Sequence, residues 1–167
     1  MRGNIDTDVI IRIERLVGNS IRGTLGKWAF GALRYLPDGS ENPEFILNRE
    51  PYRQAEILVT GPNFGCGSSR EGAVWSLQEM GIRAVIGSSF GDIFFANCFQ
   101  NGILPIIVDK EIVDSLAAEI EATQGAGRIS IDLEAQTIIS PTGKTARASR
   151  SIRAGAKACC RASMRSR

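Results

Sequence analysis

The chain has 167 residues, of which 43% are hydrophobic and 23% are charged, and this composition is typical of one globular domain. No apolar run approaches the ~20 residues of a membrane-spanning helix, and the lack of histidine excludes imidazole metal ligands and histidine general bases from this chain. The net charge of +2 hides an uneven distribution, because residues 144–167 carry eight basic side chains and no acidic one.

The first 54 residues have an irregular pattern. Residues 6–13 contain a strand-like Val-Ile-Ile run, residues 20–26 resemble a loop, and residues 28–36 predict a short helix or strand. Turn signals follow at 37–39 and 41–43, where proline, glycine and asparagine gather.

Strands and helices alternate over the next part of the chain. Short apolar runs predict strands at 55–60, 84–87 and 104–108. Helical spacing follows each strand, from near Ser69 to a stop at Gly81, from 91–100 to a stop at Gly102, and over 110–123 with Asp109 as a cap.

Residues 129–133 and 137–139 then predict a hairpin. Three strand–helix units indicate an α/β fold with a mixed, partly parallel sheet, and the hairpin contributes its antiparallel strands.

The sequence GCGSSRE at residues 65–71 lies between a predicted strand and a predicted helix. Glycines let a backbone approach a ligand closely, and the first turn of a helix offers unpaired N–H groups to an anion. Two hydroxyls and a planar guanidinium suited to a carboxylate follow at once. The alternative is an ordinary helix cap, in which Ser68 or Ser69 binds the first turn and Glu71 complements the helix dipole.

Four separated motifs, in order, resemble the small subunit of 3-isopropylmalate dehydratase. They are residues 4–11 (NIDTDVII), 38–48 (DGSENPEFILN), 63–71 (NFGCGSSRE) and 89–105 (SFGDIFFANCFQNGILP). The resemblance covers about residues 4–143. It implies a single aconitase swivel-like β/β/α domain over residues 1–143, with a truncated N-terminus.

The resemblance also implies a partner. In that family a separate large subunit, forming a heterodimer or heterotetramer with the small one, holds a 4Fe-4S iron–sulfur cluster through three cysteines. This chain has four cysteines and no CxxC pair, so we expect free thiols in a cytoplasmic protein that binds no metal or cofactor itself. Cys66, although it lies in the glycine loop, is expected to be a small packed thiol.

The implied reaction interconverts 2-isopropylmalate and 3-isopropylmalate by dehydration and rehydration in leucine biosynthesis. By the resemblance, Ser68 is the catalytic general base, acting as an alkoxide, and Ser69 and Arg70 bind a substrate carboxylate. Asp8 and Arg22 are further candidates for substrate binding. The alternatives are a turn or cap aspartate for Asp8 and an exposed loop arginine for Arg22.

The chain departs from the family pattern at two places near these residues. Residues 72–75 read GAVW where many members have His-Ala-Pro, and Arg12 replaces a proline. Residues 12–16 resemble the family's flexible specificity loop. Because of these departures, the alternative to isopropylmalate is the substrate of a paralogue, which acts on methylmalate, citraconate or a homoaconitate. A non-catalytic module that binds anions or nucleic acid is the other alternative.

Residues 144–167 form a basic tail that departs completely from the family. It is predicted to be disordered, with a nucleic-acid-binding arm as the alternative, and we expect no nucleic-acid or membrane partner. A third prediction is a shifted reading frame: codons can be chosen for residues 158–166 that, read two bases later, give Leu-Leu-Gln-Gly-Leu-Asp-Glu-Ile, which resembles the family's usual ending.

Overall fold

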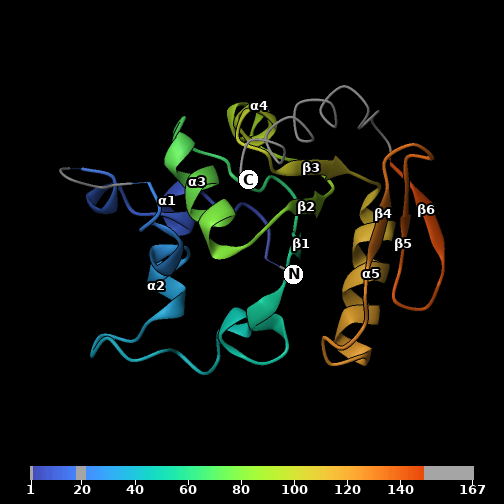
Figure 1. Ribbon diagram of the computed structural model, residues 1–167, viewed down its shortest axis with the longest axis horizontal. Helices are drawn as coiled ribbons and strands as arrows, with labels where there is room; N and C mark the ends of the chain where they lie inside the picture. The colour runs from blue at the N-terminus through green and yellow to red at the C-terminus, as the bar shows by residue number, and fades with distance from the viewer. Residues whose placement is uncertain (1, 18–21, 149–167) are drawn as a thin grey trace.

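The computed structural model describes residues 2–17 and 22–148 (Figure 1). Within them, two three-stranded sheets lie on either side of one long helix, α5 (Lys110–Ala122). None of the helices in this part of the chain is long and apolar enough to cross a membrane.

The first sheet is parallel and has the order β1 (Ile57–Val59), β2 (Ala84–Gly87), β3 (Leu104–Ile107). Leu58 pairs with Val85, and Val85 with Pro105. Proline has no N–H to donate to a neighbouring strand, and the edge position of β3 accommodates it.

Helices cover both faces of the parallel sheet. Successive side chains of a strand point to opposite faces, and the central strand follows this rule. Val85 packs in one buried cluster with residues of α3 (Glu71–Met80) and α4 (Asp92–Gln100), whereas Ala84 and Ile86 pack in another with residues of α5. The α3–α4 side carries the loop that is described below.

The second sheet is antiparallel, with the order β4 (Ser130–Asp132), β5 (Thr137–Ile139), β6 (Thr145–Arg147). The predicted hairpin is confirmed, but it belongs to this separate sheet and does not extend the parallel one. Ile138 is buried in one cluster with Val113 and Leu116 of α5. Helix α5 therefore separates the two sheets because it offers apolar side chains to each.

Residues 6–13 do not contain the expected strand. The strand-like run forms instead the short helix α1 (Thr7–Ile10), which starts because the Asp6 carboxylate accepts a hydrogen bond from the backbone N–H of Asp8 at 2.7 Å. Residues 28–36 contain the helical alternative, α2 (Gly31–Arg34), preceded by a turn of 3₁₀-helix, η2 (Gly26–Trp28). Three more such turns are η1 (Ile13–Arg15), η3 (Ile46–Asn48) and η4 (Tyr52–Gln54).

The predicted boundary at residue 143 falls just before β6. Thr145–Arg147 pair with β5, and Lys144 lies 3.1 Å from the carboxylate of Glu119 in α5. The first residues of the basic stretch thus belong to the antiparallel sheet. Residues 149–167 lie outside the described part of the chain. The predictions of a disordered tail and a shifted reading frame concern mainly these residues.

Candidate active site

The loop between β1 and α3 is shaped by two glycines in the left-handed region, Gly65 at φ +71° and Gly67 at φ +95°. A Cβ atom at Gly65 would lie 2.3 Å from the ring of Phe94, and one at Gly67 would lie 2.5 Å from the Asp6 carboxylate. Both contacts are shorter than any real Cβ contact, so the loop fits against α4 and the N-terminal segment only with glycine at these two positions.

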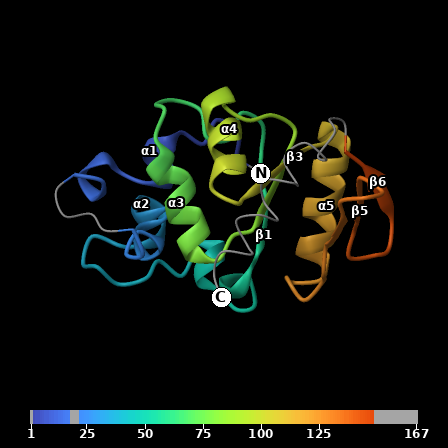
Figure 2. The same cartoon turned by 45° about the horizontal axis from the view of Figure 1, so that its top comes forward.

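The N-terminal segment runs alongside this loop and is hydrogen-bonded to it. The N–H of Gly65 donates to the carbonyl of Ile5 at 2.7 Å, and the N–H of Thr7 donates to the carbonyl of Cys66 at 2.8 Å. The Thr7 hydroxyl donates to the carbonyl of Ser68 at 3.1 Å. Helix α1 is thereby held beside the start of α3, as Figure 2 shows.

Ser68 and Ser69 do not cap α3. The helix begins at Glu71 after Arg70, and no side chain caps it. Both serines are exposed, and neither hydroxyl has a hydrogen-bond partner within residues 2–17 and 22–148. The interpretation of these serines as ordinary caps is therefore wrong, and their hydroxyls remain available at the helix N-terminus.

Arg70 and Asp8 form an ion pair across the two segments. The Arg70 side chain is 17% exposed and that of Asp8 is 52% exposed, so the pair lies at the surface with the arginine largely covered. The cap of α1 is Asp6, which excludes the cap alternative for Asp8. The structure thus brings Asp8, Arg70 and the two serines into one place, as expected for a common site.

Arg22 is held by α3 and by Asn101. Its guanidinium lies over the ring of Trp75 in α3, 4.9 Å from the centroid, and Nη2 donates to the Asn101 side-chain oxygen at 2.9 Å. The carboxylate of Glu79 accepts the N–H groups of the residues that follow, Gly23, Leu25 and Gly26. Arg22 is exposed, as the loop alternative predicts, yet its side chain is fixed against α3.

Asn101 is the polar residue that sequence reasoning missed. It follows α4, is 7% exposed, and connects Arg22 to the Glu71 side chain at the start of α3. Its partners are 79 and 30 residues away in the chain. An asparagine before Gly102 reads in sequence only as a helix end, so no local signal marks it.

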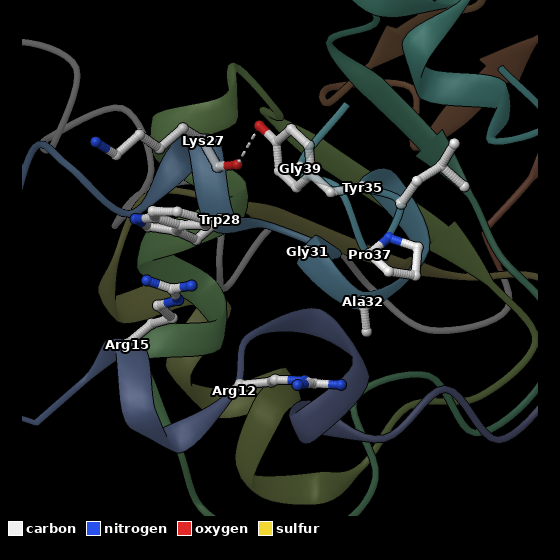
Figure 3. A pocket seen from close by; sticks show the side chains of 10 residues that line it. Arg12, Arg15, Lys27, Trp28, Gly31, Ala32, Tyr35, Pro37 and Gly39 are labelled. Carbon is white, nitrogen blue, oxygen red and sulfur yellow. Dashed lines mark hydrogen bonds between the residues drawn. The ribbon is translucent and has the colours of Figure 1, made fainter. Parts of the chain in front are cut away.

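A groove of about 760 Å³ lies between the segment that follows α1 and the segment that contains η2 and α2 (Figure 3). Arg12 and Arg15 line it from the first of these, Lys27 and Trp28 line it from η2, and Tyr35 lines it from the end of α2. The Arg15 guanidinium lies 3.6 Å from the centroid of the Trp28 ring. This cation–π contact attaches residues 12–16, the predicted specificity loop, to η2.

The same segment touches the start of α3 through Leu16. A Cβ atom at Gly72 would lie 2.5 Å from the Leu16 side chain, so the buried Gly72 makes room for Leu16. The glycine that departs from the family pattern therefore lets Leu16 pack against α3, two residues from Arg70.

The described residues contain no group of three or more His, Cys, Asp or Glu side chains able to hold a metal ion. Cys98 is buried, and burial raises the pKa of its thiol far above the ordinary value, which disfavours the thiolate that binds metals. Cys66 is half-buried and free. One partly covered thiol in the loop does not provide the ligands of an iron–sulfur cluster.

The chain resembles known proteins over most of its length. The family profile of the aconitase C-terminal domain matches residues 4–111, and that of LeuD_N matches residues 114–147. A 3-isopropylmalate dehydratase small subunit from Gluconobacter oxydans is 56% identical over 142 residues, which are 84% of this chain and 67% of that protein. Its counterpart from Agrobacterium fabrum is 53% identical over 144 residues, 85% of this chain and 70% of that protein.

A solved structure agrees with these relatives. The crystal structure of 3-isopropylmalate dehydratase from Methanocaldococcus jannaschii matches with a TM-score of 0.62 and 29% sequence identity. The match covers 87% of this chain and 74% of that one.

Proposed function

Because the chain belongs to the aconitase C-terminal domain family and, within it, to the 3-isopropylmalate dehydratase small subunits, we propose that it is the small subunit of a hydro-lyase of leucine biosynthesis. The substrate pair is 2-isopropylmalate and 3-isopropylmalate. One observation in the structure carries the proposal: two uncommitted serine hydroxyls and an ion-paired arginine stand together at the N-terminus of α3.

This arrangement suits the binding of a carboxylate. The first N–H groups of α3 and the positive end of its dipole favour an anion there, and Ser69 adds a hydroxyl donor. Asp8 orients the planar guanidinium of Arg70, whose remaining N–H groups then meet the carboxylate. Charge that develops on the carboxylate as the neighbouring carbon loses its proton is stabilised by the same donors, which are already in place.

Ser68 is the proposed general base. As an alkoxide it takes the proton from the carbon next to the bound carboxylate, and the hydroxyl group leaves from the adjacent carbon. Addition of hydroxide to the carbon that lost the proton, and return of the Ser68 proton to the carbon that lost the hydroxyl group, gives the isomer and restores the alkoxide. The Arg70 guanidinium and the N–H groups of α3 lower the energy of the alkoxide once a partner surface excludes water from the loop.

The iron–sulfur cluster is assigned to a separate large subunit. Lewis-acid assistance to the leaving hydroxyl is the chemistry that such a cluster supplies when bound. The described part of this chain does not fit the cluster, since it has neither a trio of cysteines nor another ligand set. We therefore infer that the small subunit acts only in a heterodimer or heterotetramer with that partner.

One observation favours a second substrate class. Leu16 of the predicted specificity loop packs on Gly72, two residues from Arg70, at a position where many family members have histidine. A changed contact between this loop and the residues beside Arg70 supports methylmalate as the alternative substrate. The reaction type is unchanged by this alternative.

The deciding experiment is co-expression with the large subunit, anaerobic reconstitution of the cluster, and an assay on isopropylmalate, methylmalate and homocitrate. We expect the highest kcat/KM on isopropylmalate and no turnover by the small subunit alone. A preference for methylmalate establishes the alternative, and a complex that is loaded with cluster but turns over none of the three contradicts the proposed function.

A further inference from the structure

We propose that Asn101 is a positioning residue that holds Arg22 and the start of α3 in fixed places around the substrate. This inference rests on the proposed function, since it takes Arg22 and Arg70 as groups that bind the substrate. It adds a residue that lies outside the loop and does not touch the substrate itself.

The side-chain amide of Asn101 uses all of its hydrogen-bonding capacity. Its oxygen accepts from Arg22 Nη2 and from the indole N–H of Trp75, both at 2.9 Å. Its nitrogen donates to the Glu71 carboxylate and to the carbonyl of Asn97, also at 2.9 Å each. An asparagine amide has two lone pairs and two N–H bonds, and here every one is matched.

These partners leave the amide only one orientation. Arg22 and Trp75 can only donate at the atoms involved, and the Glu71 carboxylate and a backbone carbonyl can only accept. A flipped amide would turn its N–H groups towards the donors of Arg22 and Trp75. Its oxygen would then face two acceptors, the Glu71 carboxylate and the Asn97 carbonyl. Because Asn101 is 7% exposed, water cannot easily replace the lost bonds, and the flipped state is costly.

The position of Asn101 itself is also fixed. Its backbone carbonyl accepts from Gln78 Nε2 at 2.7 Å, and its backbone N–H is bonded to the last turn of α4. Asn101 therefore ties three segments together: the end of α4, the first and middle turns of α3, and the loop that carries Arg22.

The consequence for the site follows from Glu71. It is the first residue of α3 and follows Arg70 directly, so displacement of the Glu71 carboxylate moves the backbone next to the Arg70–Asp8 pair. Arg22 depends on the same amide, together with the Trp75 ring, for the direction of its guanidinium. One buried amide thus sets the separation between two cations that would grip the two ends of a diacid.

The test is Asn101→Asp in the reconstituted complex. The aspartate still accepts from Arg22 and Trp75, but it places a carboxylate against that of Glu71. We expect KM for isopropylmalate to rise about 10- to 100-fold, the range for losing a hydrogen bond to a charged group. We expect kcat to fall as well, by a smaller factor, because the displaced start of α3 also carries the donors that stabilise the charge developing in the reaction.

Two further variants separate positioning from general damage to the fold. Gln100→Glu makes the same amide-to-carboxylate change at the neighbouring, exposed residue and is expected to leave KM unchanged. Glu71→Gln added to Asn101→Asp provides an amide that donates to the new aspartate, and we expect it to recover part of the rise in KM, since the contact with the Asn97 carbonyl stays repulsive. An unchanged KM in Asn101→Asp, or no recovery in the double variant, overturns the proposal.

A spectroscopic readout keeps this inference apart from the proposed function. In the ¹⁵N-labelled small subunit, the indole N–H resonance of Trp75 should shift in Asn101→Asp, because its acceptor becomes charged, whereas that of Trp28 should stay. An unmoved Trp75 resonance overturns the proposed geometry. If the wild-type complex is inactive on every substrate while the resonance shifts, the proposed function fails and the Asn101 network stands.

Discussion

The carboxylate of Glu119 is enclosed by donors of its own chain, whereas the hydroxyls of Ser68 and Ser69 face solvent without a partner in the described residues. Glu119 is 8% exposed and accepts from the Thr142 hydroxyl at 2.8 Å, which ties α5 to the antiparallel sheet. In that region polar groups serve the fold. In the glycine loop the backbone is equally fixed, but the two serine hydroxyls have no partner among the described residues, and we propose that they meet a ligand.

This contrast predicts that changes in the loop alter catalysis and that changes around Glu119 alter stability. Apart from the loss of Ser68 itself, the largest effect is expected for Arg70→Lys in the reconstituted complex. A lysine cannot pair with Asp8 and present a planar fork to a carboxylate at the same time. We expect kcat/KM to fall on the order of 10²- to 10³-fold, with little change in the melting temperature.

The matched control is Arg83→Lys, the same change at an exposed arginine outside the loop, which should leave the kinetics unaltered. If Arg70→Lys keeps more than a third of the wild-type kcat/KM, the guanidinium is not a substrate ligand.

The next largest effect concerns the shape of the loop. Gly65→Ala adds a methyl group 2.3 Å from the Phe94 ring at a φ of +71°. We expect a loss of about 1–3 kcal/mol in the free energy of unfolding from overpacking, in addition to the strain of the left-handed backbone. Chemical denaturation measures the loss.

Gly39→Ala isolates the strain, because Gly39 has a φ of +85° and open space around it. We expect it to cost about 1 kcal/mol. Equal losses in the two variants would mean that the contact with Phe94 does not constrain the loop.

The pH dependence of stability tests the region around Glu119. Hydrogen bonds from Ser140 and then from Thr142 and Lys144, acting against burial, lower the pKa of Glu119 from 4.5 to about 2. The folded pKa lies below the unfolded one, so the ionised carboxylate stabilises the fold above pH 4.5, and this stabilisation is lost as the pH falls towards 2.

We therefore expect Glu119→Gln to unfold more easily than the wild type at pH 6, and the difference to shrink steadily as the pH falls from 4.5 to 2. The kinetics of the reconstituted complex at neutral pH should be unaffected. Parallel stability curves for the two proteins over this range would contradict the role given to Glu119.

The smallest effect is expected at the groove. Arg15→Gln removes the guanidinium from the Trp28 ring, and an exposed cation–π contact contributes about 0.5–1 kcal/mol. Arg12→Gln, in the same groove, is the control and should have no effect on unfolding. The same small loss in both variants would show that the stacking contact does not hold the segment.

The sequence predicts α3, α4 and α5 and the strands between them well, because their apolar residues recur at regular spacing and glycines mark the helix ends. It fails at α1. A Val-Ile-Ile run has strand propensity, but the Asp6 cap and the burial of Ile10 against the core favour a helix there. Local propensity is overridden by a contact that no local pattern reveals.

The candidate site, too, can be predicted from the sequence only in part. The loop and its two serines are readable because glycines and hydroxyls are adjacent in the chain, and Asp8 is found through its motif. The ion pair between Asp8 and Arg70 and the four bonds of Asn101 depend on segments far apart in sequence. Such contacts follow only from the packing of α1, α3 and α4.

The central claim is that the Ser68 hydroxyl, which has no hydrogen-bond partner among the described residues, is the catalytic base. The most direct measurement is the turnover of isopropylmalate by a complex carrying Ser68→Ala, with Ser130→Ala, at an exposed serine of β4, as the control. We predict that turnover is abolished while the small and large subunits still assemble. Turnover close to that of the wild type in a fully assembled complex would contradict the claim.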